Sequence, residues 1–104
     1  MVQSRFSFVQ PGAQVELQEQ PIHRVSLLPM YRVMLHNDDH HEAGYVARSL
    51  VKSVPSLCYE QAWQVMLQAH TSGCAVVIVC PRETAEYYQE RLQSFGLTVT
   101  LEPE

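Results

Sequence analysis

The order of hydrophobic and polar residues predicts regular structure from residue 31 onward. Residues 31–36 alternate with the period of a strand and place Tyr31, Val33 and Leu35 on one face. A helix is predicted next, because apolar residues recur three and four positions apart at Ala43, Val46, Ala47, Leu50 and Val54. Pro55 ends this helix, since the residue before a proline avoids the helical conformation.

A second helix is predicted from about residue 56 to residue 71. Its apolar stripe consists of Tyr59, Ala62, Trp63, Met66, Ala69 and His70. Gly73 is suited to end it, because glycine tolerates the left-handed conformation that often follows a helix. Met66 and His70 are four positions apart, so their side chains share one face. A polar group on that face has either a structural partner or a ligand.

Two strands and a third helix are predicted after Gly73. Residues 75–80 are apolar and rich in β-branched side chains, which favours a central strand. Pro81 opens the third helix, where its missing N–H costs little, and Gly96 ends it. The buried face of this helix is predicted to consist of Ala85, Tyr88, Leu92 and Phe95. Residues 97–101 alternate with period two, which indicates a half-buried strand.

The elements follow one another in the order β-α-α-β-α-β, which predicts a small α+β domain. We expect a three-stranded antiparallel sheet packed against three helices. Residues 10–24 are rich in Gln and Pro and show no sustained period. We therefore expect residues 1–30 to be a flexible N-terminal extension and residues 31–104 to be the core domain.

Composition and charge narrow the class of protein. The chain has 104 residues, of which 46% are hydrophobic and 17% charged, as expected for one globular domain. The net charge of -4 and the lack of a basic patch argue against nucleic acid or an anionic membrane as partners. The first residues lack the apolar segment of a signal peptide, and residues 75–80 are too short to span a bilayer. The three cysteines form no CxxC pair, which fits a reducing, cytosolic or organelle-stromal compartment.

Candidate chemistry follows the first strand, where Asn37, Asp38 and Asp39 stand side by side. The two carboxylates accept hydrogen bonds at neutral pH, and the amide adds an acceptor oxygen. Such a group suits a donor-rich cation, for example a peptide α-amino group, whose reference pKa is ~8. His70 is the natural residue to add a further acceptor, because a neutral imidazole has one free lone pair.

Four other interpretations remain open at this point. Asn37, Asp38 and Asp39 are also typical of a turn or a helix cap, and a histidine on an apolar face is often a core residue. A metal site could use His36, His40, His41 and Glu42, although adjacent histidines do not normally reach one ion, and no metal or cofactor is expected. A Cys74–His70 nucleophile would need a reactive thiol, yet Cys74 stands at the entry to a buried strand. The chain could also be a non-catalytic α+β interaction module without a ligand pocket.

Several segments together resemble the ClpS family of N-degron adaptors. These segments are "YRVMLHNDD", "VMLQAHTSG", "RETAEYYQERL" and "LTVTLE", and the resemblance covers roughly residues 31–102. It implies a monomeric protein that is not an enzyme, from the bacterial cytosol or the stroma of a plastid. Such an adaptor binds proteins that begin with Leu, Phe, Tyr or Trp, and delivers them to the N-terminal domain of a ClpA- or ClpC-type AAA+ unfoldase. The N-terminal extension corresponds to the family's flexible tail.

The resemblance also assigns roles to individual residues. The α-amino group of the substrate would be held by Asn37, Asp38, Asp39 and His70. The pocket for the first side chain would be formed by His41, Ala43, Val46, Met66, Ala69 and Leu97. The contact with the unfoldase would involve Glu83, Glu86 and Tyr88.

The chain departs from the family pattern at two of these positions. Ala43 stands where the family usually has a methionine that excludes β-branched first residues, so Ile and Val become additional candidate first residues. Tyr88 replaces a lysine on the face that contacts the unfoldase, whereas Glu83 keeps the family's acidic residue.

Overall fold

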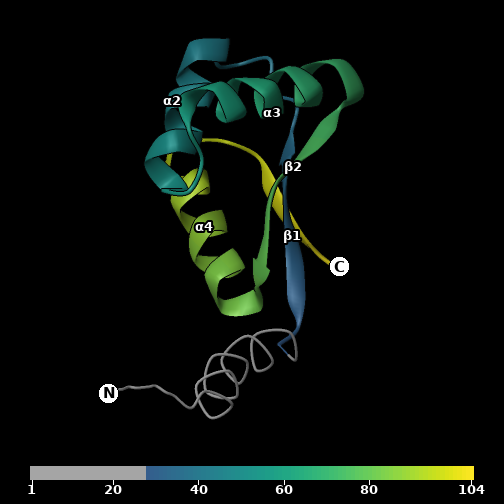
Figure 1. Ribbon diagram of the computed structural model, residues 1–104. Coiled ribbons are helices and arrows are strands. Elements are labelled where there is room, and N and C mark those ends of the chain that lie inside the picture. The colour runs from purple at the N-terminus through teal and green to yellow at the C-terminus, as the bar shows by residue number, and fades with distance from the viewer. Residues whose placement is uncertain (1–27) are drawn as a thin grey trace, which may run out of the picture.

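The computed structural model describes residues 28–104, so most of the predicted N-terminal extension lies outside the described residues. The elements are β1 (Met30–His36), α2 (Ala43–Ser53), α3 (Tyr59–Ser72), β2 (Cys74–Pro81), α4 (Arg82–Ser94) and β3 (Val99–Pro103). Figure 1 shows this path along the chain. The predicted order β-α-α-β-α-β is confirmed.

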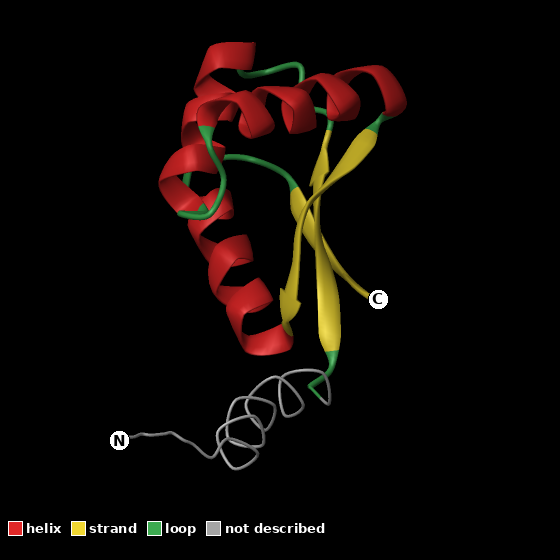
Figure 2. Ribbon diagram, in the orientation of Figure 1, coloured by secondary structure: helices red, strands yellow, loops and turns green. Residues whose placement is uncertain are grey.

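The three strands form an antiparallel sheet in the order β2-β1-β3. Figure 2 shows α2 and α4 on one side of this sheet and α3 crossing over one end of it. The helix α4 runs alongside the strands, whereas α2 and α3 cover the end of the sheet where β1 finishes (Figure 1). The prediction of a three-stranded antiparallel sheet packed against three helices is confirmed.

The prediction of a central strand at residues 75–80 is wrong, because β2 lies at an edge of the sheet and β1 is central. Val76 and Val79 are 40% and 36% exposed, so the apolar run is not buried on both faces. The pairing with β1 skips Val77, which makes this residue part of a β-bulge. The bulge and the β-branched composition together hide the alternation by which an edge strand is normally recognised.

Two predicted boundaries are corrected by local hydrogen bonds. The helix α3 begins at Tyr59 rather than near residue 56, because the Leu57 N–H donates to the Val54 carbonyl oxygen in a turn. The strand β3 spans Val99–Pro103 rather than residues 97–101, since its pairing with β1 starts with Leu35 opposite Val99. Residues 97 and 98 therefore belong to the connection that precedes β3.

The core lies between the sheet and the three helices. Its largest fully buried apolar side chains are Val33, Leu35, Leu50, Val54 and Leu92. The apolar stripe of α3 is narrower than predicted: Ala62, Met66 and Ala69 are buried, whereas Tyr59 and His70 are exposed. Within residues 28–104 no helix is long and apolar enough to cross a membrane.

Candidate functional site

The acceptor-rich segment begins where β1 ends, and two backbone hydrogen bonds fix its position. The His36 N–H donates to the Thr98 carbonyl oxygen at 3.0 Å, which ties the end of β1 to the connection before β3. The Asn37 N–H donates to the Gly73 carbonyl oxygen at 2.9 Å. Gly73 caps α3 in the left-handed conformation, with a φ of 94°. The second bond therefore holds Asn37 beside the last turn of the helix that carries His70.

Asp38 makes two hydrogen bonds inside its own loop. Its Oδ1 accepts the backbone N–H of His40 at 2.7 Å, which is the contact of an Asx turn. Its Oδ2 lies 2.8 Å from Nδ1 of His41, an ion pair when that ring is protonated. The His40 N–H and then the His41 ring stabilise the carboxylate, so the pKa of Asp38 falls below its ordinary value of 3.8. The turn-forming interpretation is therefore correct for Asp38. The side chains of Asn37 and Asp39 take no part in this turn.

His41 connects this loop to two other parts of the fold. Its ring stacks on Tyr45 of α2, with a centroid distance of 5.0 Å and an interplanar angle of 11°. The Tyr45 hydroxyl donates to the Phe95 carbonyl oxygen at 2.7 Å. The His41 Nε2 also lies close to Gly96, where an added Cβ would stand 3.1 Å away from it. The loop after β1 is thus fastened to α2 and to the turn that follows α4.

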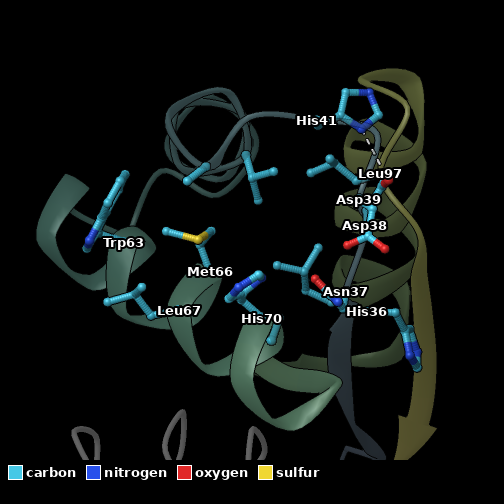
Figure 3. A pocket seen from close by; sticks show the side chains of 14 residues that line it. His36, Asn37, Asp38, Asp39, His41, Trp63, Met66, Leu67, His70 and Leu97 are labelled. Carbon is cyan, nitrogen blue, oxygen red and sulfur yellow. Dashed lines mark hydrogen bonds and ion pairs between the residues drawn. The ribbon is translucent and has the colours of Figure 1, made fainter.

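A cavity of about 410 Å³ opens between this loop, α2 and α3, as Figure 3 shows. Its walls come from the end of β1, the loop after it, α2, α3 and the connection before β3. The lining residues are Leu35, His36, Asn37, Asp38, Asp39, His41, Ala43, Val46, Trp63, Met66, Leu67, Ala69, His70 and Leu97. Every residue that the resemblance assigned to amine binding or to the apolar pocket is in this wall.

One end of the cavity is rich in hydrogen-bond acceptors. Figure 3 shows the side chains of Asn37 and His70 near each other at this end of the cavity, one from the end of β1 and the other from α3. Among residues 28–104, the side chains of Asn37, Asp39 and His70 have no hydrogen-bonding partner. The last turn of α3 adds the negative end of a helix dipole, and the lining contains neither Lys nor Arg. This end is therefore suited to a cation with several N–H donors.

The rest of the cavity wall is apolar. Four of its residues are buried, with at most 7% of each residue exposed: Val46, Met66, Ala69 and Leu97. Ala43 is the first residue of α2 and is exposed at the rim, where it contributes only a methyl group. A cation that carries an apolar side chain would therefore meet complementary surfaces at both ends.

Four lining residues were missed by the sequence analysis. Leu35 and His36 are at the end of β1, and His36 Nε2 forms a 2.7 Å hydrogen bond with Thr100 Oγ1. Trp63 and Leu67 are on α3, and Leu67 is 40% exposed. The spacing of Trp63 and Leu67 could have identified them. Trp63 precedes Met66 by three positions and Leu67 precedes His70 by three positions, so each lies on the same helix face as a predicted site residue.

The residues predicted to contact the unfoldase lie outside the cavity, on α4. Glu83 and Glu86 are exposed, and Glu86 accepts a hydrogen bond from Arg82 Nε at 3.2 Å. Tyr88 is only half-buried against the core, whereas the neighbouring Tyr87 is 53% exposed. In the part of the chain described, no group of three or more His, Cys, Asp or Glu side chains is placed to hold a metal ion.

Known proteins share both this sequence and this fold. The family model described as ATP-dependent Clp protease adaptor protein ClpS matches residues 27–100. The chain belongs to the ClpS family. It is 48% identical over 77 residues to the ATP-dependent Clp protease adapter protein ClpS of Gloeobacter violaceus. The aligned residues make up 74% of this chain and 83% of the relative. It is also 43% identical over 75 residues to a chloroplastic Clp protease adapter of Chlamydomonas reinhardtii. Here the aligned residues make up 72% of this chain and 46% of the relative.

A solved ClpS structure has the same fold. ClpS2 of Agrobacterium tumefaciens, bound to L-phenylalaninamide, is 34% identical, with a TM-score of 0.69 over 73% of this chain and 98% of that chain. Membership of the family means that the chain is an adaptor of the Clp protease. The relatives are named as adaptors, which agrees with the expectation that the chain is not an enzyme. They come from bacteria and chloroplasts, the two settings that the resemblance implied.

Proposed function

We propose that this ClpS-family adaptor binds the free α-amino group and the bulky hydrophobic first residue of its substrate proteins. The single observation that supports this is the division of the cavity into an acceptor-rich end and an apolar end. Asn37, Asp39 and His70 accept N–H bonds from the amino group, and Asp38 adds negative charge beside them. The ligand of the Agrobacterium relative, L-phenylalaninamide, has a free α-amino group and an aromatic side chain.

Both halves of the cavity are needed for useful affinity. A hydrogen bond to a charged group contributes ~1.5–3 kcal/mol, and burial of a Leu or Phe side chain contributes ~1.5–3 kcal/mol. Either contribution alone is small beside the entropy that a bound peptide loses. A blocked N-terminus or a small first residue is therefore rejected.

Ala43 widens the range of first residues in this proposal. Leu, Phe, Tyr and Trp are the principal first residues, and Ile and Val are accepted as well. The support is the small methyl group of Ala43 at the rim of the cavity, where a larger side chain would narrow the entrance. A wider entrance leaves room for the second branch on the Cβ atom of Ile or Val.

Delivery to the protease uses a different surface. The partner is the N-terminal domain of a ClpA- or ClpC-type AAA+ unfoldase, and it contacts Glu83, Glu86 and Tyr88. All three residues are on α4, outside the cavity wall, so a substrate and an unfoldase can be bound together. The exposed Tyr87 adds apolar area beside this surface.

Peptide titration tests the proposed function. Fluorescence anisotropy would compare a labelled peptide that begins with Leu with the same peptide acetylated at its N-terminus. The free peptide should bind and the acetylated one should not, because acetylation removes the charge and two donors. Asn37→Ala should weaken binding about tenfold to hundredfold.

The matched control is Gln68→Ala, which changes an exposed residue of α3 outside the cavity. This variant should bind as the wild type does. Thermal melting should show unchanged stability for Asn37→Ala, since the Asn37 side chain is exposed and has no partner within residues 28–104. Equal affinity for the free and acetylated peptides would contradict the proposal.

A further inference from the structure

Two cavity residues of α3 have no task in the proposed function. Trp63 and Leu67 form an apolar end of the cavity on α3, separated by Met66 from the acceptors around Asn37 (Figure 3). Tyr59 continues this surface, since its ring stacks on Trp63 with a centroid distance of 6.2 Å. Tyr59 is 49% exposed and Leu67 is 40% exposed. A contiguous exposed apolar surface that joins a pocket is typical of a ligand-binding groove.

The cavity is also larger than one side chain requires. A closed cavity of roughly 150 Å³ accommodates a benzene molecule, which has the size of a phenylalanine ring. The cavity here measures about 410 Å³. The first side chain of a substrate therefore leaves part of the space free, and Trp63 and Leu67 line the same cavity.

We propose that Tyr59, Trp63 and Leu67 form a second subsite, which binds an apolar or aromatic side chain at the third residue of the substrate. This inference rests on the proposed function and deepens it. The first residue places its amino group at His70 and its side chain against Met66. The chain then runs along α3 toward Tyr59, and the third side chain packs on the Trp63 ring.

The spacing of the two subsites matches an extended peptide. Trp63 precedes His70 by seven residues, which is roughly 10 Å along a helix axis at a rise of 1.5 Å per residue. An extended chain covers about 3.3 Å per residue, so the first and third Cα atoms are about 6.6 Å apart, and the length of the third side chain covers the remaining distance. Side chains one and three of an extended peptide point to the same side, whereas the second points away. The third residue is therefore the one that reaches Trp63 when the first fills the pocket.

Three labelled peptides that differ only at positions two and three test this subsite. They begin Leu-Ser-Ser, Leu-Ser-Phe and Leu-Phe-Ser, and share the remaining sequence. The full-length protein should bind Leu-Ser-Phe about fivefold to tenfold more tightly than Leu-Ser-Ser, as expected for partial burial of one ring. Leu-Phe-Ser should gain less than twofold, roughly the noise of such a measurement.

Substitutions assign the gain to the subsite. Trp63→Gln and Leu67→Gln should each lower the Leu-Ser-Phe to Leu-Ser-Ser affinity ratio toward one, whereas Gln68→Ala should keep it. Leu67 is exposed enough for Leu67→Gln to fold even if Trp63→Gln is destabilised, and thermal melting would check both.

Each remaining outcome overturns the inference in a recognisable way. If Leu-Ser-Ser binds but phenylalanine at position three gives no gain, the second subsite is wrong and the proposed function stands. The same holds if the gain appears at position two or survives both substitutions. If no Leu-started peptide binds the wild type, the proposed function and the subsite fail together.

Discussion

Replacing Ala43 with methionine should change which first residues are accepted without changing the fold. Ala43 is the first residue of α2, is exposed, and lines the cavity at its rim. Methionine is a good helix former, so the helix should tolerate it. The added side chain can lie over the cavity, where it narrows the space beside the Cβ atom of the bound first residue.

The size of the effect follows from the added volume. Methionine adds three heavy atoms to the methyl group of Ala43, and each buried CH₂-sized group contributes ~0.8 kcal/mol. A Leu or Phe side chain that passes the new wall therefore gains up to about 2 kcal/mol of contact. An Ile or Val side chain is branched at its Cβ atom, which lies beside the new methionine side chain. Overpacking at such a position typically costs ~1–3 kcal/mol. The smallest of these costs, ~1 kcal/mol with no gain for Leu, already raises the preference for Leu over Ile about fivefold, and we expect at least that change.

The assay is fluorescence anisotropy with four peptides that begin with Leu, Phe, Ile or Val. In the wild type, Ile and Val should bind within about tenfold of Leu, because the side chains differ by at most one CH₂ group. Gln64→Met is the matched control, since it places the same side chain on an exposed site of α3 outside the cavity. A wild-type protein that ranks Leu and Phe far above Ile and Val, with the same ranking in Ala43→Met, would refute the reasoning.

Two further predictions concern the loop that carries the acceptors. Gly96→Ala should lower the free energy of unfolding in urea more than Gly73→Ala does. Both glycines have a φ near 90°, a conformation that costs about 1–2 kcal/mol for alanine. Only at Gly96 does the new Cβ also meet a side chain, His41, at 3.1 Å. Equal losses would show that this contact relaxes freely. Because the pKa of Asp38 is lowered from 3.8 in the folded state, its charge stabilises the fold above that pH, and this contribution is lost as the pH falls through the folded pKa. The stability difference between wild type and Asp38→Asn should therefore shrink in urea titrations from pH 6 toward about pH 2, and a constant difference would contradict this origin.

Periodicity was sufficient to predict most of the fold, because each helix and strand buries one face. The strand that ends at His36 was predicted with its observed end, and the first residue of the predicted apolar stripe, Ala43, is the first residue of α2. The position of β2 was not predictable, since a β-bulge and β-branched residues make an edge strand resemble a central one. Strand order depends on pairings between distant segments, and such pairings leave no periodic signal in one sequence.

The sequence predicted which residues line the cavity better than it predicted their contacts with one another. The residues alone left Asn37, Asp38 and Asp39 open between a turn and a binding cluster, and the family pattern grouped them with His70. The contact between Asp38 and His41 depends on a loop conformation that no periodicity encodes. Trp63 was assigned to the apolar stripe of its helix, and it does pack against the core. The stripe alone does not show that Trp63 also lines the cavity.

The hydrogen bond between the Asn37 N–H and the Gly73 carbonyl oxygen has a kinetic consequence. It joins the two segments that supply the acceptors before any ligand arrives, so no rearrangement has to precede binding. Association should then occur at a similar rate for different N-termini, and the lifetime of the complex should set their ranking. A substrate with a weakly binding first residue would dissociate while one with a tightly binding first residue is still bound. Substrates would then be selected after binding, according to whether release or transfer to the unfoldase is faster.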